Sequence, residues 1–147
     1  PERELWRDFR RNRITEIVKR CSHAVKAVRS TVKVSAAVIA NAPVVKNAYF
    51  QDWKRWVKDG ILDILFSMSY DEGMYNFRNY IKIASETRDK IPTYMGIIIK
   101  KDSKIHVPLK QMRLIYDKGF FGFCIFSYDD GQKQIRKMSR KIINRIP

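Results

Sequence analysis

The chain has 147 residues, of which 45% are hydrophobic and 31% charged, a composition typical of a globular protein and not of a disordered segment. Its length is sufficient for one domain with a substantial core, so we expect residues 1–147 to form a single domain. No apolar run approaches the roughly 20 residues that a membrane-spanning helix needs.

The formal net charge of +15 raises the question of nucleic-acid binding. The basic residues of the first and last predicted helices fall off the apolar stripes, where they coat solvent-exposed faces. The sequence contains no helix-turn-helix, zinc-knuckle or RNP-type aromatic pattern. A basic nucleic-acid-binding domain is therefore kept as an alternative that rests on charge alone.

The two cysteines and two histidines predict neither a disulfide nor a metal site. Cys21 falls on an apolar helix face and Cys124 in an apolar strand, so both are expected to be small buried hydrophobic residues. His23 and His106 have no metal-motif neighbours, and we expect no metal and no cofactor. The chain begins at Pro1 without an initiator methionine, so we expect an excerpt of a longer protein, which leaves its localisation open.

The first third of the chain predicts a helix, a strand and a second helix. Residues 1–11 are highly charged and form a connection or a helix start. From Asn12 a helical stripe is formed by Ile14, Ile17, Val18, Cys21, Ala24, Val25 and Val28. The β-branched segment Thr31–Ile39 predicts a strand, and residues 41–47 predict a loop. Next comes a short helix with Trp53, Trp56 and Val57 on one face, which Gly60 ends because glycine tolerates positive φ.

Three further strand–helix pairs follow. Nearly continuous apolar segments predict strands at Ile61–Met68, Pro92–Ile99 and Phe120–Phe126. The helices after them carry stripes formed by Phe77, Tyr80, Ile81 and Ala84, then by Leu109, Met112, Ile115 and Tyr116, and last by Ile135, Met138, Ile142 and Ile146. Strands that alternate with amphipathic helices predict an α/β fold with a parallel sheet and right-handed crossovers.

Two architectures fit this order. One is a small doubly wound sheet, in which the strand order reverses about a switch point. The other is the C-terminal half of a (β/α)8 TIM barrel, which needs about 250 residues when whole. Four strands are half of eight, and the chain opens on a helix without a strand of its own. Both facts favour the half-barrel.

In either architecture, ligands bind beyond the carboxyl ends of the strands. Asp71 is the best candidate carboxylate for catalysis there, and its neighbour Glu72 points another way. Asp63 enters its strand from the opposite end and is expected to be structural. The candidate substrate-binding residues on the same rim are Asn41, Gln51, Asp52, Met68, Tyr70 and Tyr128.

Some of these residues have a second interpretation. Asp52 either joins the rim or stabilises a helix N-terminus, where a negative charge meets the helix dipole. Tyr70 and Tyr128 can stack on a sugar ring or close the mouth of a barrel. Asp129 and Asp130 are expected to be helix-start residues. The absence of GxGxxG, P-loop, GxSxG and HExxH motifs leaves nucleotide, serine-hydrolase and zinc-protease chemistry without support.

A series of short segments carries a resemblance over nearly the whole chain: Trp6–Arg11, Lys33–Val38, Gln51–Trp53 with Trp56 and Gly60, Asp63 with Met68 and Tyr70, Gly96–Ile97, Leu109 with Gln111, and Gly122 with Phe126–Ser127. In order and spacing, these segments resemble the glycosyl-hydrolase-like family 10 proteins of bacteria. The resemblance implies the second half of a (β/α)8 barrel and a hydrolase of glycosidic bonds in a polysaccharide. It also implies a protein that is often exported or attached to the cell surface.

Glycoside hydrolysis usually needs two carboxyl groups, one acting as an acid and the other as nucleophile or base. The acidic pair of the family lies at the end of the fourth barrel strand, upstream of the helix that opens this chain. We therefore expect this segment to contribute a rim around Tyr70, Asp71 and Tyr128, with Gln51 and Asp52 nearby, and to be inactive alone.

A half-barrel leaves two strand edges unpaired, so the missing half or a second copy is expected to cover them. The alternative from a different class is a non-catalytic carbohydrate-binding or scaffold barrel.

Overall fold

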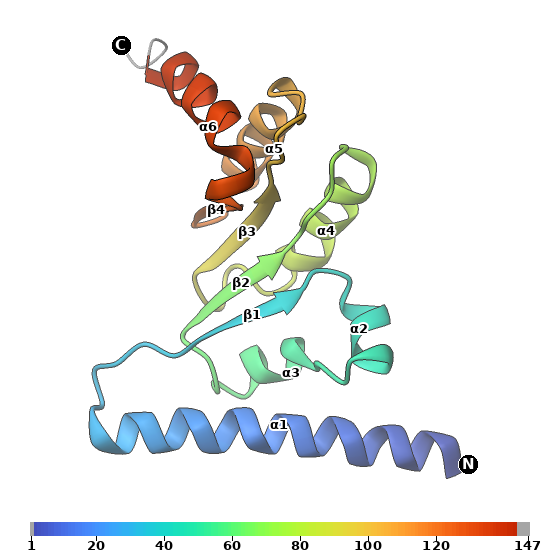
Figure 1. The fold of residues 1–147 in the computed structure, drawn as a ribbon. Helices are drawn as coiled ribbons and strands as arrows, with labels where there is room; N and C mark the ends of the chain where they lie inside the picture. The colour runs from blue at the N-terminus through green and yellow to red at the C-terminus, as the bar shows by residue number, and fades with distance from the viewer. Residues whose placement is uncertain (1, 144–147) are drawn as a thin grey trace.

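The computed structural model describes residues 2–143 and shows helices and strands in alternation (Figure 1). The elements are α1 (Glu2–Val28), β1 (Ser35–Ile39), α2 (Ala42–Ala48), α3 (Trp53–Lys58), β2 (Ile64–Met68), α4 (Tyr75–Ser85), β3 (Thr93–Ile98), α5 (His106–Asp117), β4 (Gly122–Phe126) and α6 (Tyr128–Ile143). The predicted α/β alternation is confirmed.

The four strands form one parallel sheet in the order β1-β2-β3-β4. Its register pairs Ala37 with Phe66, Phe66 with Tyr94 and Tyr94 with Gly122. The spatial order follows the chain without the reversal that a doubly wound sheet requires. Of the two architectures that fit the sequence, the doubly wound sheet is therefore wrong for the described residues.

One face of the sheet is covered by the helices. Its most buried strand residues are Val38, Leu65, Met95 and Ile97, whose side chains pack in two hydrophobic clusters with the apolar faces of the helices. The register places all four on the same side, because side chains alternate across a strand. Burial on this face accounts for every second residue of the apolar strands.

The opposite face, called here the open face, carries aromatic side chains that no described helix covers. Phe66 on β2 stacks on Tyr94 of β3 with ring centroids 5.0 Å apart, and Tyr94 meets Phe121 edge-on at 5.2 Å. Cys124 and the exposed Phe126 lie on the same face of β4. Parallel sheets are normally buried on both faces, whereas Phe66, Tyr94 and Cys124 on this face are only partly buried.

The short helix α3 confirms the prediction made for it. Trp53, Trp56 and Val57 are buried together against the sheet. Gly60 follows the helix with φ of +66°, the left-handed conformation that glycine adopts most readily. The predicted loop at residues 41–47 is wrong, because residues 42–48 form α2, whose first turn accepts Pro43 without losing a hydrogen bond.

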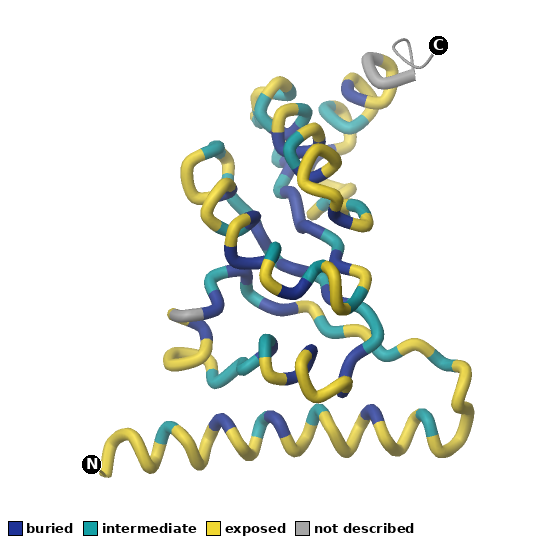
Figure 2. The backbone as a smooth tube through the Cα atoms, turned by 180° about the vertical axis from the view of Figure 1, so that it is seen from behind, coloured by how far each residue is buried: buried dark blue, intermediate teal, exposed yellow. Residues whose placement is uncertain are grey.

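Helix α1 confirms only part of the predicted apolar stripe: Ile14 and Val18 pack partly buried against the core, whereas the other members are exposed. Cys21 is exposed and Val28 is 91% exposed, as Figure 2 shows by the mostly yellow course of this helix. Its buried positions are Arg11, Thr15 and Ser22. The helix docks through polar bonds, for example from the Ser22 hydroxyl to the Ile61 carbonyl at 2.7 Å. A count of apolar residues alone therefore does not define the docking face of such a helix.

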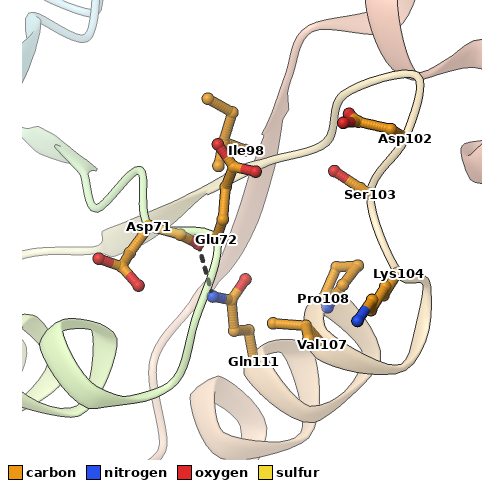
Figure 3. Close-up of a pocket in the computed structure, with 9 residues that line it drawn as sticks. All are labelled: Asp71, Glu72, Ile98, Asp102, Ser103, Lys104, Val107, Pro108 and Gln111. Carbon is orange, nitrogen blue, oxygen red and sulfur yellow. Dashed lines mark hydrogen bonds between the residues drawn. The ribbon is translucent and has the colours of Figure 1, made fainter.

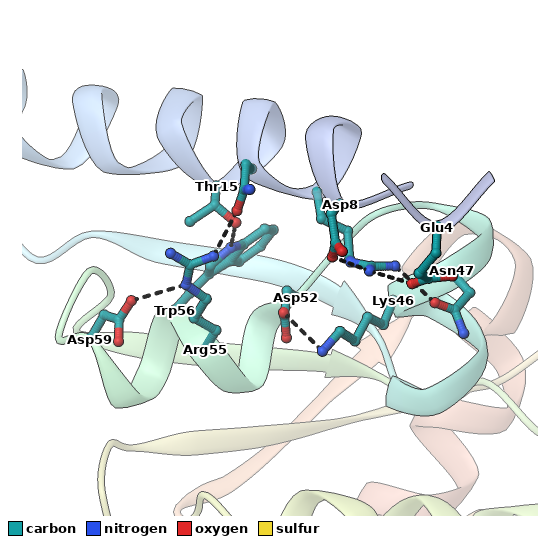
Figure 4. A network of polar contacts seen from close by, with 11 residues as sticks. Glu4, Asp8, Thr15, Lys46, Asn47, Asp52, Arg55, Trp56 and Asp59 are labelled. Atoms are coloured by element: carbon teal, nitrogen blue, oxygen red, sulfur yellow. Dashed lines mark hydrogen bonds and ion pairs between the residues drawn. The ribbon is translucent and has the colours of Figure 1, made fainter. Parts of the chain in front are cut away.

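Figure 4 shows further polar bonds that attach α1 to α2 and α3. The Arg11 guanidinium is only 6% exposed, binds the carboxylates of Glu4 and Asp8, and donates to Asn47 Oδ1 at 3.0 Å. The two carboxylates raise the pKa of Arg11 further above its ordinary value. This arginine belongs to the charged segment 1–11, of which the structure assigns residues 2–11 to the first turns of α1 and not to a connection.

The later elements follow the predictions with local differences. The stripe of α4 is confirmed, since Phe77, Ile81 and Ala84 are buried. On α5, Tyr116 was predicted to be buried but is exposed, whereas Gln111 is buried. The strands are shorter than predicted; Ile61 and Leu62, for example, are buried in the connection before β2. On α6 Met138 is buried, while the side chains of Ile142 and Ile146 lie outside the described part.

Candidate functional site

The carboxyl ends of all four strands meet at one edge of the sheet, because the strands are parallel. The loop between β2 and α4 and the loop between β3 and α5 rise side by side from this edge. A pocket of about 320 Å³ lies between them (Figure 3). It is lined by Asp71, Glu72, Ile98, Asp102, Ser103, Lys104, Val107, Pro108 and Gln111. This rim is where the parallel architecture predicts a ligand.

Tyr70 covers the rim end of the open face. Its ring crosses β3 at Gly96 and stacks on Phe126 of β4, with centroids 5.1 Å apart and planes at 23°. A Cβ atom at Gly96 would lie 2.8 Å from Tyr70 Cε1 and 2.8 Å from the carbonyl oxygen of Ser67. Burial, followed by the nearby Cys124, raises the pKa of Tyr70, so its hydroxyl remains protonated near neutral pH. The crossing therefore requires glycine at this position.

Asp71, the predicted catalytic carboxylate, is held by the start of α4. Its Oδ1 accepts from the Gly73 backbone N–H at 2.7 Å, and its Oδ2 accepts from Asn76 Nδ2 at 2.9 Å. Figure 3 shows this carboxylate directed away from Gln111 and the α5 wall of the pocket. Both oxygens thus stabilise the loop, and each retains a lone pair for a further donor.

Gln111 joins helix α5 to the β2–α4 loop and is the residue that sequence reasoning missed. Its Nε2 donates to the carbonyl oxygens of Asp71 at 2.9 Å and Gly73 at 2.8 Å. On the opposite wall Glu72 forms an ion pair with Lys100, and this bond raises the pKa of Lys100. In the sequence, only the family resemblance, which includes Leu109 and Gln111, drew attention to this residue. Helical periodicity instead predicted that Tyr116 is buried.

Three of the predicted substrate-binding residues hold the β1 end of the rim or lie next to it. Gln51 Oε1 accepts from the backbone N–H of Ile39 at 3.2 Å, which closes the connection after β1. Asp52 makes no capping bond with its side chain and pairs with Lys46 at 3.3 Å (Figure 4). Asn41 stands directly before α2, also without a side-chain capping bond.

The remaining two lie at the ends of β2 and β4. Met68 is the last residue of β2, half-buried and on the same face as Tyr70. Tyr128 opens α6, is 59% exposed, and accepts a hydrogen bond from Gln132 Nε2 at 3.0 Å. This bond, followed by the nearby Arg136 guanidinium, lowers the pKa of Tyr128.

The opposite end of the sheet is structural. Asp63 accepts from the Val34 backbone N–H at 2.8 Å and from Lys26 Nζ at 2.8 Å, as its position before β2 predicts. These bonds, Lys26 first, lower the pKa of Asp63. On the side of the rim, Asp129 and Asp130 lie in the first turn of α6, as expected for helix-start residues.

Within residues 2–143, no three or more His, Cys, Asp or Glu side chains gather in a way that could hold a metal ion. A search of the helices in the same range finds none with the length and apolar character needed to cross a membrane.

Comparison with known proteins gives one family. The family model described as Glycosyl hydrolase-like 10 matches residues 1–115, which reach from α1 into α5 and include β1, β2 and β3. The curated proteins contain no match to this chain. Because the family match covers well over half of the chain, the protein belongs to the glycosyl hydrolase-like 10 family, and its function is glycoside-hydrolase-like at the level of that family.

Proposed function

We propose that this chain is the C-terminal half of a (β/α)8 barrel that hydrolyses glycosidic bonds in a polysaccharide, and that it supplies a substrate-binding rim. The family supports the reaction class. One observation carries the placement of the substrate: at the carboxyl edge, the ring of Tyr70 lies on the open face, stacked on Phe126. Aromatic rings with convergent polar groups beside them are typical of small-molecule sites.

The sheet itself supports the half-barrel. Strands β1 and β4 are its edges in the described chain, and they carry backbone groups that a neighbouring strand can pair. The strands run in chain order with the helices on one face, as in a barrel wall. A second set of four strands, from an upstream half or from a second copy, would pair with both edges and bury the open face.

Light scattering tests this part of the proposal. The 147-residue chain alone is expected to associate with itself, because its edges and its open face remain uncovered. A stable, well-behaved monomer would contradict the half-barrel.

The catalytic role proposed for Asp71 depends on the assembled barrel. Hydrolysis needs two carboxyl groups at about 5–5.5 Å for retention or about 6.5–9.5 Å for inversion. Asp71 would be one of the polar groups at the reacting bond, with its orientation fixed by Gly73 and Asn76. The acidic partner would come from the other half of the barrel.

A non-catalytic carbohydrate-binding barrel is the second candidate, and one observation favours it. Both carboxylate oxygens of Asp71 already bind the loop and the start of α4, a purely structural arrangement. In this case the rim would bind sugar through Tyr70 and Phe126 without chemistry.

An assay of polysaccharide cleavage and binding by the assembled barrel separates the two candidates. If it is a hydrolase, Asp71→Asn is expected to abolish cleavage and retain binding, while Asp59→Asn, a change beyond the rim near Arg55, leaves both unchanged. Binding without cleavage by the unmodified protein would favour the second candidate. Neither binding nor cleavage would contradict both.

A further inference from the structure

Gln111 has an amide oxygen without a donor at the bottom of the rim pocket. The residue is 1% exposed, and no hydrogen bond from any part of the chain that the structure describes reaches its Oε1. The orientation of the amide is fixed, because its Nε2 donates to two backbone carbonyls, Asp71 O and Gly73 O. An exchange of the nitrogen and oxygen positions would set the oxygen against both carbonyls.

The orphaned oxygen faces the pocket. In Figure 3 the nitrogen of the Gln111 amide is bound to the loop, and the oxygen lies on the side of Val107 and Pro108. Buried polar atoms are nearly always hydrogen-bonded, so an exception that lines a pocket indicates a ligand group that donates. A hydroxyl group is such a donor, and it needs no opposite charge.

The rest of the wall fits a polyhydroxylated ligand. Ile98, Val107 and Pro108 form an apolar side against which C–H groups can pack. Two of the other polar residues of the wall are already bound within the protein: Ser103 Oγ accepts from the backbone N–H of Lys100 at 2.8 Å, and Glu72 pairs with the Lys100 side chain. A volume of about 320 Å³ lies at the lower end of the range for small-molecule sites.

We propose that this pocket, which we call the Gln111 pocket, binds one sugar unit of the polysaccharide. A sugar hydroxyl donates to Gln111 Oε1, and the C–H face of the ring packs on Val107 and Pro108. The inference rests on the proposed function and adds a subsite to it. Tyr70 contacts the sugar on the open face, whereas the Gln111 pocket lies between the two loops. Since Gln111 also holds the carbonyl of Asp71, an occupied pocket stabilises the loop that carries the proposed catalytic carboxylate.

Side-chain NMR of the protein tests this directly. The probes are maltohexaose, cellohexaose and chitohexaose, titrated against protein with ¹⁵N-labelled glutamine, and Gln111→Glu assigns the amide signal. At least one probe is expected to shift the Gln111 amide signal saturably. Val107→Trp fills the pocket without touching the amide bonds and is expected to weaken binding at least about tenfold. Lys110→Trp places the same ring on the exposed side of α5 and is expected to retain the binding.

The outcomes separate the subsite from the proposed function. A probe that shifts the Tyr70 ring signals and leaves the Gln111 amide signal unchanged contradicts sugar binding in the Gln111 pocket and supports sugar binding at the rim. A Gln111 shift that survives Val107→Trp also overturns it, since the sugar then binds elsewhere. Binding of no probe at either position overturns both the subsite and the carbohydrate function.

Discussion

Replacing Gly96 with alanine tests the packing that places Tyr70 on the rim. The new Cβ would lie 2.8 Å from the carbonyl oxygen of Ser67, a backbone atom that cannot move away alone, and 2.8 Å from Tyr70 Cε1. Overpacking of this kind costs about 1–3 kcal/mol. A displaced ring also loses its stacking on Phe126, which adds about 0.5–1.5 kcal/mol. We therefore expect Gly96→Ala to lower the free energy of unfolding by about 2–4 kcal/mol.

For a chain of 147 residues, this loss corresponds to a fall in Tm of roughly 6–13 °C, measured by circular dichroism at 222 nm. The near-ultraviolet signal of the stacked rings is expected to fall as well. Gly122→Ala is the matched control on the next strand, because its Cβ would meet only the movable ring of Tyr94 at 3.1 Å. A Gly96→Ala protein that is as stable as the control, with an unchanged aromatic signal, would refute the reasoning.

Two further predictions concern the polar bonds that attach α1 and the amino end of the sheet. The lowered pKa of Asp63 means that the stability given by its bonds is present above its ordinary pKa and is lost as pH falls through the folded value. Asp63→Asn is therefore expected to lower the free energy of unfolding by about 1.5–3 kcal/mol at pH 7. In acid, its free energy of unfolding, measured with urea, is expected to approach that of the unmodified protein. A difference between the two proteins that stays the same at every pH would contradict this. Trp56→Phe removes the 2.9 Å bond from Trp56 Nε1 to Thr15 Oγ1. The buried hydroxyl left without this partner is expected to lower the free energy of unfolding by about 1–3 kcal/mol. Thr15→Val in the same background is expected to restore most of that free energy. Failure of the second change to restore stability would show that the lost bond is not the cause.

The architecture could be predicted because its causes are local. A strand covered by helices on one face and aromatic on the other is apolar nearly throughout, so β2 and β4 were visible as apolar runs. The face shared by Trp53, Trp56 and Val57 follows from helical spacing, and the end of α3 follows from Gly60. These features depend on residues that lie within a few positions of one another.

The docking face of α1 could not be predicted in the same way. Arg11, Thr15 and Ser22 are buried because they bind groups that lie 36 to 41 positions further along the chain. Their polar side chains reduce the apolar periodicity on the face that is buried. The apolar residues on the other face, Ile17 and Val28 among them, remain exposed.

The candidate site, too, could be predicted from the sequence only in part. The ends of parallel strands place Tyr70 and Asp71 on the rim from sequence alone. The direction of each side chain depends on residues from other elements: Gly96 lets the ring of Tyr70 cross β3, and Gln111 on α5 holds the carbonyl of Asp71. No pattern within the β2–α4 loop contains this information.

The central claim is that the rim at Tyr70 contacts a carbohydrate substrate, and the kcat/KM of polysaccharide cleavage by the assembled barrel tests it most directly. Tyr70→Ala is expected to lower kcat/KM by about 10- to 100-fold, which corresponds to roughly 1.4–2.8 kcal/mol of transition-state stabilisation. Tyr75→Ala, at a 91% exposed position that opens α4, is expected to leave kcat/KM unchanged. Equal kcat/KM values for the Tyr70→Ala protein and the unmodified protein would contradict the account.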